Sequence, residues 1–276
     1  SIRKVISFFL VWINRNSQEN LNFVKSYQPR NKEVKHLRIL LIGPVGSGKS
    51  SFINSVDGVF QDRITGRAAV DAVIGGSVTN KYKTYKIRKD PEGSYSFIFN
   101  DTMGFERSAG RGVHVEDIKL ALKGHVKEDY EFNPKEPLTG GDFYNPSPTL
   151  GDRVHVLVSV VPADKISLMS EEDVIKLREV RLAASAMNIP QLAIITKIDE
   201  ACPKVRRNIK NAYWSKVLKE KVDRCSSLLG IPPNCIFLVK NYSSEITPSD
   251  DINALILVAL RQMVCFGEDF LKDLQD

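Results

Sequence analysis

RILLIGPVGSGKSS, residues 38–51, is the stretch that decides the fold, because it sets an apolar strand pattern directly before a glycine-rich loop and a helix. The loop, Gly43-Pro-Val-Gly-Ser-Gly-Lys49-Ser50, has the G-x-x-x-x-G-K-[ST] pattern of a phosphate loop in its strand–loop–helix context. Small residues let backbone N–H groups turn in on a phosphate at a helix N-terminus, where unsatisfied donors favour anions. A glycine-rich turn without a ligand is the alternative. We predict phosphate contacts from Gly43, Val45, Gly46, Ser47, Gly48, Lys49, Ser50 and Ser51.

Two further motifs follow at strand ends. Asp101-Thr-Met-Gly104 matches the D-x-x-G pattern, in which the Asp reaches Mg²⁺ through water and the Gly N–H bonds the γ-phosphate. Thr196-Lys197-Ile-Asp199 matches [NT]KxD, whose carboxylate accepts both the N1–H and the 2-amino group of guanine. The Lys197 stem would cover the purine face. Three such motifs in this order, where open parallel sheets bind ligands, predict GTP or GDP with Mg²⁺, the Ser50 hydroxyl and Asp101 serving the metal.

The remaining nucleotide contacts are less sharply defined. The switch threonine, a third metal contact, is expected at Thr79, with Thr65 as the second candidate, and Asn241 is expected near the base. Phe105 occupies the position where related GTPases have the glutamine that orients the attacking water. Hydrolysis is therefore expected to be slow, with no assigned catalytic residue, unless a partner, dimerisation or a local arginine such as Arg107 or Arg111 assists it.

Short β-type runs alternate with longer helical ones, which predicts an α/β Ras-like P-loop NTPase fold, a mostly parallel sheet flanked by helices. An N-terminal docking segment covers 1–30, and one GTPase-type domain covers 31–276, with an insertion at about 106–152 between the D-x-x-G strand and the next strand. Strands are expected at 37–42, 81–88, 95–100, 154–161, 191–196 and 235–239. Helices are expected at 49–60, 113–127, 170–187, 208–229 and 250–266.

The net charge of 39 − 33 = +6 is concentrated in one segment. Residues 204–224 hold eight Lys/Arg and two Asp/Glu, so the rest is balanced at 31 against 31. We expect this basic helical face to meet an acidic partner or a membrane. The apolar run Val5 to Ile13 is too short to span a bilayer, for which about 18 residues are needed, and it is read as docking on the domain or binding a membrane surface or a partner. Four cysteines without metal-ligand spacing fit a reducing compartment.

The chain resembles the interferon-induced protein 44 and 44-like family of GTPase-like proteins. The resemblance runs from Leu21 onward through LNFVKSYQP, RILLIGPVGSGKSSFINSV, KYKTYKIR, YEFNP at 130–134, DRVHVLVSVV, NYSSE at 241–245 and ALRQM…EDFLKDL. It implies an interferon-inducible, cytoplasmic protein of antiviral innate immunity. The base motif TKID is complete here, although the family does not always keep it.

Three functions remain open from the sequence. The first is a guanine-nucleotide switch with slow hydrolysis, in which the Gly66 to Thr79 loop and the insertion change binding to a protein partner or to a second copy of the chain. The second is an interaction scaffold with a structural or vestigial nucleotide site. The third is an ATPase, which leaves Asp199 unexplained. The sequence has no specific nucleic-acid motif.

Overall fold

A six-stranded, mostly parallel sheet forms the centre of the protein in a computed structural model that describes residues 17–68, 80–105 and 112–275. The strand order is β2-β3-β1-β4-β5-β6, and all neighbouring pairs are parallel except β2 with β3. The glycine-rich loop follows the central strand β1. The strands are β1 (Leu37–Ile42), β2 (Lys83–Arg88), β3 (Ser94–Asp101), β4 (Val156–Pro162), β5 (Gln191–Thr196) and β6 (Ile236–Leu238).

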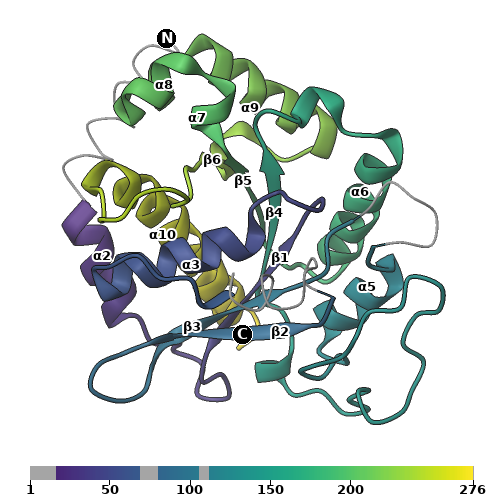
Figure 1. Cartoon of the computed structure of the whole chain (residues 1–276). Coiled ribbons are helices and arrows are strands. Elements are labelled where there is room, and N and C mark those ends of the chain that lie inside the picture. Colours follow the sequence, from purple (N-terminus) through teal and green to yellow (C-terminus); the bar gives the residue numbers. More distant parts are fainter. Residues whose placement is uncertain (1–16, 69–79, 106–111, 276) are drawn as a thin grey trace.

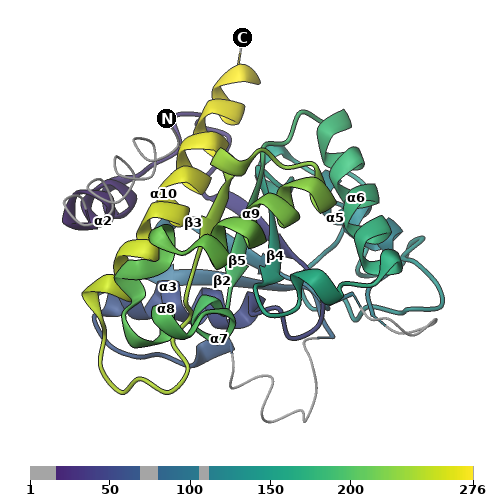
Figure 2. The ribbon, with the colours of Figure 1, turned by 90° about the horizontal axis from the view of Figure 1, so that it is seen from above.

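Helices cover both faces of this sheet, as Figures 1 and 2 show. On one face lie α3 (Lys49–Gln61) and the long α10 (Asp250–Asp273), and on the other lie α5 (Val115–Lys123), α6 (Glu171–Ala186) and α9 (Lys216–Leu229). The shorter elements are α2 (Ser17–Ser26), η1 (Leu150–Asp152), η2 (Ile166–Leu168), α7 (Ile198–Ala201), α8 (Pro203–Arg207), η3 (Ile209–Trp214) and η4 (Pro233–Cys235). The expected α/β architecture with a mostly parallel sheet is confirmed.

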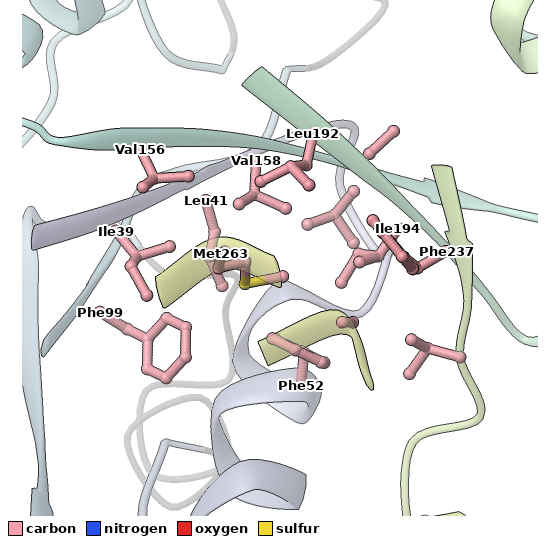
Figure 3. Close-up of a cluster of buried hydrophobic side chains, with 14 of the residues drawn as sticks. Ile39, Leu41, Phe52, Phe99, Val156, Val158, Leu192, Ile194, Phe237 and Met263 are labelled. Atoms are coloured by element: carbon pink, nitrogen blue, oxygen red, sulfur yellow. The ribbon is translucent and has the colours of Figure 1, made fainter. Parts of the chain in front are cut away.

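The core explains why the central strands are mostly apolar. Every residue of β4 is buried, as expected for a parallel strand with helices on both faces. Figure 3 shows the face under α3 and α10, where Phe52 and Met263 pack against alternate residues of the strands. Phe52 meets Phe99 edge-on, with ring centroids 5.9 Å apart. The labelled strand residues of this cluster are Ile39, Leu41, Phe99, Val156, Val158, Leu192, Ile194 and Phe237.

The expected single helix at 208–229 is wrong. Instead, α8, η3 and α9 follow one another, separated at Asn208 and Ser215. Both separating residues cap the next element with a side-chain oxygen, Asn208 accepting from Lys210 N–H at 3.0 Å and Ser215 from Leu218 N–H at 3.3 Å. The predicted apolar face is broken accordingly, because Trp214 is 58% exposed. The other predicted elements lie where expected, with ends that differ by a few residues, up to seven at the end of α10.

The helix α2 packs against the C-terminal helix α10. Arg261 donates to Asn20 Oδ1 at 2.7 Å, and its guanidinium lies 4.7 Å from the ring centroid of Phe23. Near the helix end, the Tyr27 hydroxyl donates to Glu268 at 2.8 Å. The expected docking run Val5 to Ile13 lies outside the described residues. In the described part, no helix has the length and apolar character to cross a bilayer.

The structure describes the region of the expected insertion from residue 112 onward. Its turns run beside the chain that enters β2, where Tyr82 N–H donates to Tyr130 O at 2.8 Å and Phe132 N–H donates to Asn80 O at 2.9 Å. Asp117, on α5 and fully buried, accepts from the Tyr130 hydroxyl at 3.0 Å and from Leu138 N–H at 2.7 Å. The segment 124–138 is therefore tied both to α5 and to the residues before β2.

His155 joins the start of β4 to β1 through both ring nitrogens. Its Nδ1 accepts from Arg38 N–H at 2.8 Å and its Nε2 donates to Leu150 O at 2.9 Å, so the ring is held neutral. Burial lowers the pKa of His155 from 6.5 to about 4. Below pH 6.5 the unfolded chain therefore binds a proton that the folded chain does not. We expect about 3 kcal/mol of stability to be lost as the pH falls from 6.5 to about 4.

Urea unfolding at a series of pH values measures this effect. The parent and His155→Gln should be compared, because the variant lacks the group that titrates. The interpretation is contradicted if the two proteins lose the same stability across this pH range.

Candidate functional site

The phosphate loop turns between the end of β1 and the start of α3. Gly46 and Gly48 have φ angles of 72° and 95°, in the left-handed region that favours glycine. A Cβ at Gly48 would also lie 2.9 Å from Asn241 Nδ2, so the loop passes close to the segment after β6. The central position of β1 places this loop at the carboxyl edge of the sheet, between the ends of β3 and β4.

Lys49, the first residue of α3, is only 7% exposed. Its Nζ lies 3.3 Å from the backbone oxygens of both Gly43 and Pro44. No carboxylate among the described residues forms an ion pair with it, and burial lowers the pKa of its amine, although nearby Asp101 acts in the opposite direction. A buried ammonium held by carbonyl groups alone is the kind of group that an anion stabilises.

Ser50 and Asp101 form a pair of oxygen donors beside the lysine. The Ser50 hydroxyl donates to Asp101 Oδ2 at 2.5 Å, and Asp101, the last residue of β3, is fully buried. The described residues contain no group of three or more His, Cys, Asp or Glu side chains able to hold a metal ion. A hydroxyl and a carboxylate are oxygen ligands of the kind that Mg²⁺ takes from a protein when phosphate oxygens and water complete its octahedron.

The D-x-x-G segment is bonded directly to the phosphate loop. Phe105 N–H donates to Gly43 O at 3.1 Å, and Val45 N–H donates to Phe105 O at 3.1 Å. A Cβ at Gly104 would lie 2.6 Å from Val45 N, so this contact needs glycine. The Phe105 side chain is 2% exposed and borders a cavity of about 440 Å³ with Pro44 and Val45. Phe105 thus fixes the two loops against each other.

Two polar side chains hold the phosphate loop from the side of β5 and β6. Thr196 Oγ1 donates to Ser47 O at 2.6 Å, and Asn241 Nδ2 donates to Gly48 O at 3.0 Å. Asn241 therefore meets the loop through its side chain. Ser47 Oγ and Asn241 Oδ1 are buried without a hydrogen-bond partner among the described residues. Two polar atoms beside the phosphate loop are therefore available for a further hydrogen bond.

Asp199 has an ionic partner that the sequence analysis missed. Lys240, two residues beyond β6, has its Nζ 3.5 Å from Asp199 Oδ2 and also pairs with Glu245. Burial opposes the charge of Lys240, but Glu245 and Asp199 outweigh it and raise the pKa of the amine. Burial also opposes the charge of Glu245, yet its bonds to Lys240 and to backbone N–H groups lower its pKa to about 2. The only sequence signal was the position of Lys240 after the last strand.

The structure brings most of the predicted site residues to one edge of the sheet. The phosphate loop, Asp101, Gly104, Thr196 and Asn241 are joined by the contacts above, and Lys197 begins α7 in a left-handed conformation with a φ of 55°. Thr65, the second switch candidate, lies beside α3, where its hydroxyl donates to Asn54 O at 3.1 Å. Thr79, Arg107 and Arg111 lie outside the described residues, as does most of the Gly66 to Thr79 loop.

Comparison with known proteins finds clear relatives. The chain is 37% identical over 255 residues to interferon-induced protein 44-like of Homo sapiens, across 91% of this chain and 56% of that protein. It is 34% identical to interferon-induced protein 44 of Homo sapiens and 33% identical to that of Mus musculus, across 92% of this chain and 57% and 60% of those proteins. The chain thus spans little more than half the length of these relatives. No protein-family model matches it.

Proposed function

The chain belongs to the family of interferon-induced protein 44 and 44-like proteins. We propose that this chain, which matches little more than half the length of those relatives, binds a guanine nucleotide with Mg²⁺. The observation that carries the proposal is the buried Lys49 ammonium at the start of α3, which forms no ion pair with a described residue and lies next to the Ser50–Asp101 pair. A desolvated cation and a ready pair of metal-ligating oxygens side by side are what a nucleotide with bound Mg²⁺ requires.

Beyond the general α/β architecture, the arrangement of the sheet supports the assignment to a Ras-like P-loop fold. The glycine-rich loop follows the central strand, and the antiparallel strand β2 lies at one edge of the order β2-β3-β1-β4-β5-β6. The loops after β1, β3, β5 and β6 all open at the same edge, where open α/β sheets bind their ligands. The residues that would contact the phosphates, the metal and the base therefore follow four different strands of the same sheet.

Each residue has a role that follows from its position. Lys49 offsets phosphate charge, while the N–H groups of the glycine-rich loop bind phosphate oxygens. Ser50 and Asp101 would hold Mg²⁺, which neutralises the charge on the β- and γ-phosphates when it is bound. Thr196 and Asn241 also position the phosphate loop, through their bonds to Ser47 and Gly48.

Asp199 is the group that selects guanine in this proposal. Its carboxylate accepts two N–H groups that adenine does not present in this arrangement. GDP or GTP with Mg²⁺ should therefore stabilise the fold, and ATP should not. At a ligand concentration of ~100 times Kd the gain is about 2.7 kcal/mol, which corresponds to a rise in Tm of roughly 5–10 °C for a domain of this size. Thermal unfolding with each nucleotide measures it.

Asp199→Asn is the matched test of the base contact, because it keeps the shape and removes the charge. We expect the variant to lose the preference for guanine while keeping the parent's stability without nucleotide. An equal shift of the parent with ATP would identify an ATPase-type site and defeat the assignment. Retained discrimination in Asp199→Asn would show that another group reads the base.

The relatives' names state that those proteins are induced by interferon. We further propose that this protein is also induced by interferon and that it acts as a slow switch in cytoplasmic antiviral innate immunity. Slow hydrolysis is consistent with Phe105, whose buried side chain cannot orient water. The second candidate is an interaction scaffold with a vestigial site. The Asp199–Lys240 ion pair favours this candidate, because it already satisfies part of the carboxylate. Loss of antiviral effect in a variant that no longer binds nucleotide separates the switch from the scaffold.

A further inference from the structure

The excess positive charge of the chain lies on one surface, formed by α8, η3 and the first part of α9. This basic surface, residues 204–224, carries eight Lys/Arg and two Asp/Glu, while the rest of the chain is balanced. Seven of the eight cations are exposed, and Lys221 is half-buried. Figure 1 shows α7, α8 and α9 together at one end of the molecule, beyond β5 and β6.

Most of this charge is not compensated within the part of the chain that the structure describes. Lys210 pairs with Asp251 at 3.6 Å and Lys219 pairs with Asp223 at 2.7 Å. The other six cations make no ion pair with a described residue; they are Lys204, Arg206, Arg207, Lys216, Lys221 and Arg224. Of the two acidic residues, only Glu220 is left to offset them. The surface therefore presents a net positive field to whatever approaches it.

Apolar groups are exposed within the same surface. Trp214, the last residue of η3, is 58% exposed, and Val217, near the start of α9, is 43% exposed. Val217, Lys221 and Arg224 follow at spacings that place them on one flank of α9, while the buried Leu218 holds the helix on the body. An exposed tryptophan therefore directly precedes the helix that carries this row of apolar and basic side chains.

The same flank continues onto a neighbouring element. Lys221 Nζ lies 3.5 Å from Ser167 Oγ of η2, and the next residue, Leu168, is 67% exposed. The exposed apolar side chains of this surface thus come from two separate segments, residues 166–168 and 214–217, with basic side chains among them. Such a combination suits a ligand that is anionic at its surface and apolar just beneath it.

We propose that the basic surface docks on an anionic phospholipid membrane, with Trp214 at the depth of the headgroups. Tryptophan and tyrosine are enriched at this depth because one end of the ring is apolar and the other is polar. Basic side chains near an anionic leaflet are attracted to it, by an amount that adds up over several residues. Five of the eight cations are lysines, which protein–protein interfaces deplete whereas they enrich arginine. Lipid therefore fits better than an acidic protein.

The basic surface that would face the membrane lies next to the edge of the sheet that carries Asp199. Arg206 of α8 donates from Nε to the backbone oxygen of Asp199 at 3.1 Å, so the basic surface begins directly behind the base-reading carboxylate. The docking itself depends only on charge and exposed apolar groups. It holds whether or not the chain binds a nucleotide.

Cosedimentation of the full chain with vesicles tests the proposal. We expect binding to phosphatidylcholine vesicles that contain phosphatidylserine, no binding to pure phosphatidylcholine, and a loss of binding as salt is raised. The variant Lys216→Glu/Lys221→Glu/Arg224→Glu should bind at least about 30-fold more weakly. The matched control, Lys123→Glu/Lys127→Glu/Lys135→Glu, reverses three exposed lysines on and after α5 and should bind like the parent.

A fluorescence measurement locates the contact without depending on the charge variants. The chain has two tryptophans, Trp12 and Trp214, so Trp12→Phe leaves one reporter on the basic surface. Its emission should shift to the blue with phosphatidylserine vesicles and stay unchanged with pure phosphatidylcholine. Trp214→Ala should weaken cosedimentation while its thermal unfolding stays like that of the parent.

Several outcomes overturn the proposal. It fails if the parent does not bind phosphatidylserine vesicles, or if it binds both kinds of vesicle equally. It also fails if the triple variant on the basic surface binds like the parent, since another segment then makes the contact. Tight binding to an acidic peptide or to nucleic acid, with no binding to the vesicles, assigns the surface to a different partner.

Discussion

Replacing Lys49 by methionine is expected to weaken the binding of GDP and GTP by about 1,000-fold and to leave the nucleotide-free fold at least as stable as the parent. The first effect follows because a desolvated cation that faces phosphate is lost. The second follows because Lys49 is buried without an ion pair to any described carboxylate, and burial lowers the pKa of its amine more than nearby Asp101 raises it. A thioether in its place relieves this burial of charge and fills a similar volume.

Isothermal titration measures the affinity, and urea unfolding without nucleotide measures the stability. Lys123→Met, at an exposed position of α5, is the control and should change neither quantity. Nucleotide binding by Lys49→Met at the parent's affinity would mean that the phosphate loop does not bind phosphate through this lysine. A large loss of stability in the nucleotide-free variant would mean instead that Lys49 serves the fold.

Gly43→Ala is expected to destabilise the protein by about 3 kcal/mol. A Cβ at this position would lie 2.2 Å from the backbone oxygen of Val160 in β4 and 3.0 Å from Ser47 Oγ. Neither neighbour can move freely, because Val160 lies within the central sheet and Ser47 accepts the bond from Thr196. The loop and the strand would have to separate, so nucleotide binding should fall together with stability.

Gly46→Ala provides the matched comparison within the same loop. Apart from its two chain neighbours, no described residue has an atom within 4 Å of a Cβ placed there, but its φ of 72° is unfavourable for alanine. The only cost is then the left-handed backbone conformation of the alanine, so the free energy of unfolding should fall by about 1 kcal/mol. Urea midpoints of both variants without nucleotide decide between the two effects. Equal losses would show that the close approach of Gly43 to β4 has little energetic weight.

The fold was predictable where the sequence pattern is local and strong. The bounds of β1 and β5 match their apolar runs, because a strand buried on both faces is apolar throughout, and α3 begins at Lys49 where the glycine-rich loop ends. The helix at 208–229 was not predictable in this way. A 3₁₀-helix and an α-helix both place apolar residues three or four apart, so the spacing did not reveal the breaks at Asn208 and Ser215.

The positions of the candidate site residues were predictable from the motifs, but the contacts between them were not. The motifs give Ser50, Asp101 and Asp199 because each belongs to a short motif at the carboxyl end of a strand. The Asp199–Lys240 pair joins residues 240 − 199 = 41 positions apart and depends on how β5 lies beside β6. The hydrogen bonds of Thr196 and Asn241 to the phosphate loop depend on the same arrangement. Such contacts come from the register of the sheet, which no single stretch of sequence specifies.

The central position of β1 also bears on how the protein is made. Ile39 pairs with Val156, which follows it by 156 − 39 = 117 residues, so at about 5–20 residues per second a ribosome makes the partner strand about 6–23 s later. The wait is longer for α10, whose Gly267 lies against the Leu37 side chain, 267 − 37 = 230 residues on. For about 12–46 s of translation, β1 therefore lacks the cover that α10 gives it in the folded protein. Apolar surface that stays uncovered during synthesis makes a nascent chain prone to aggregate.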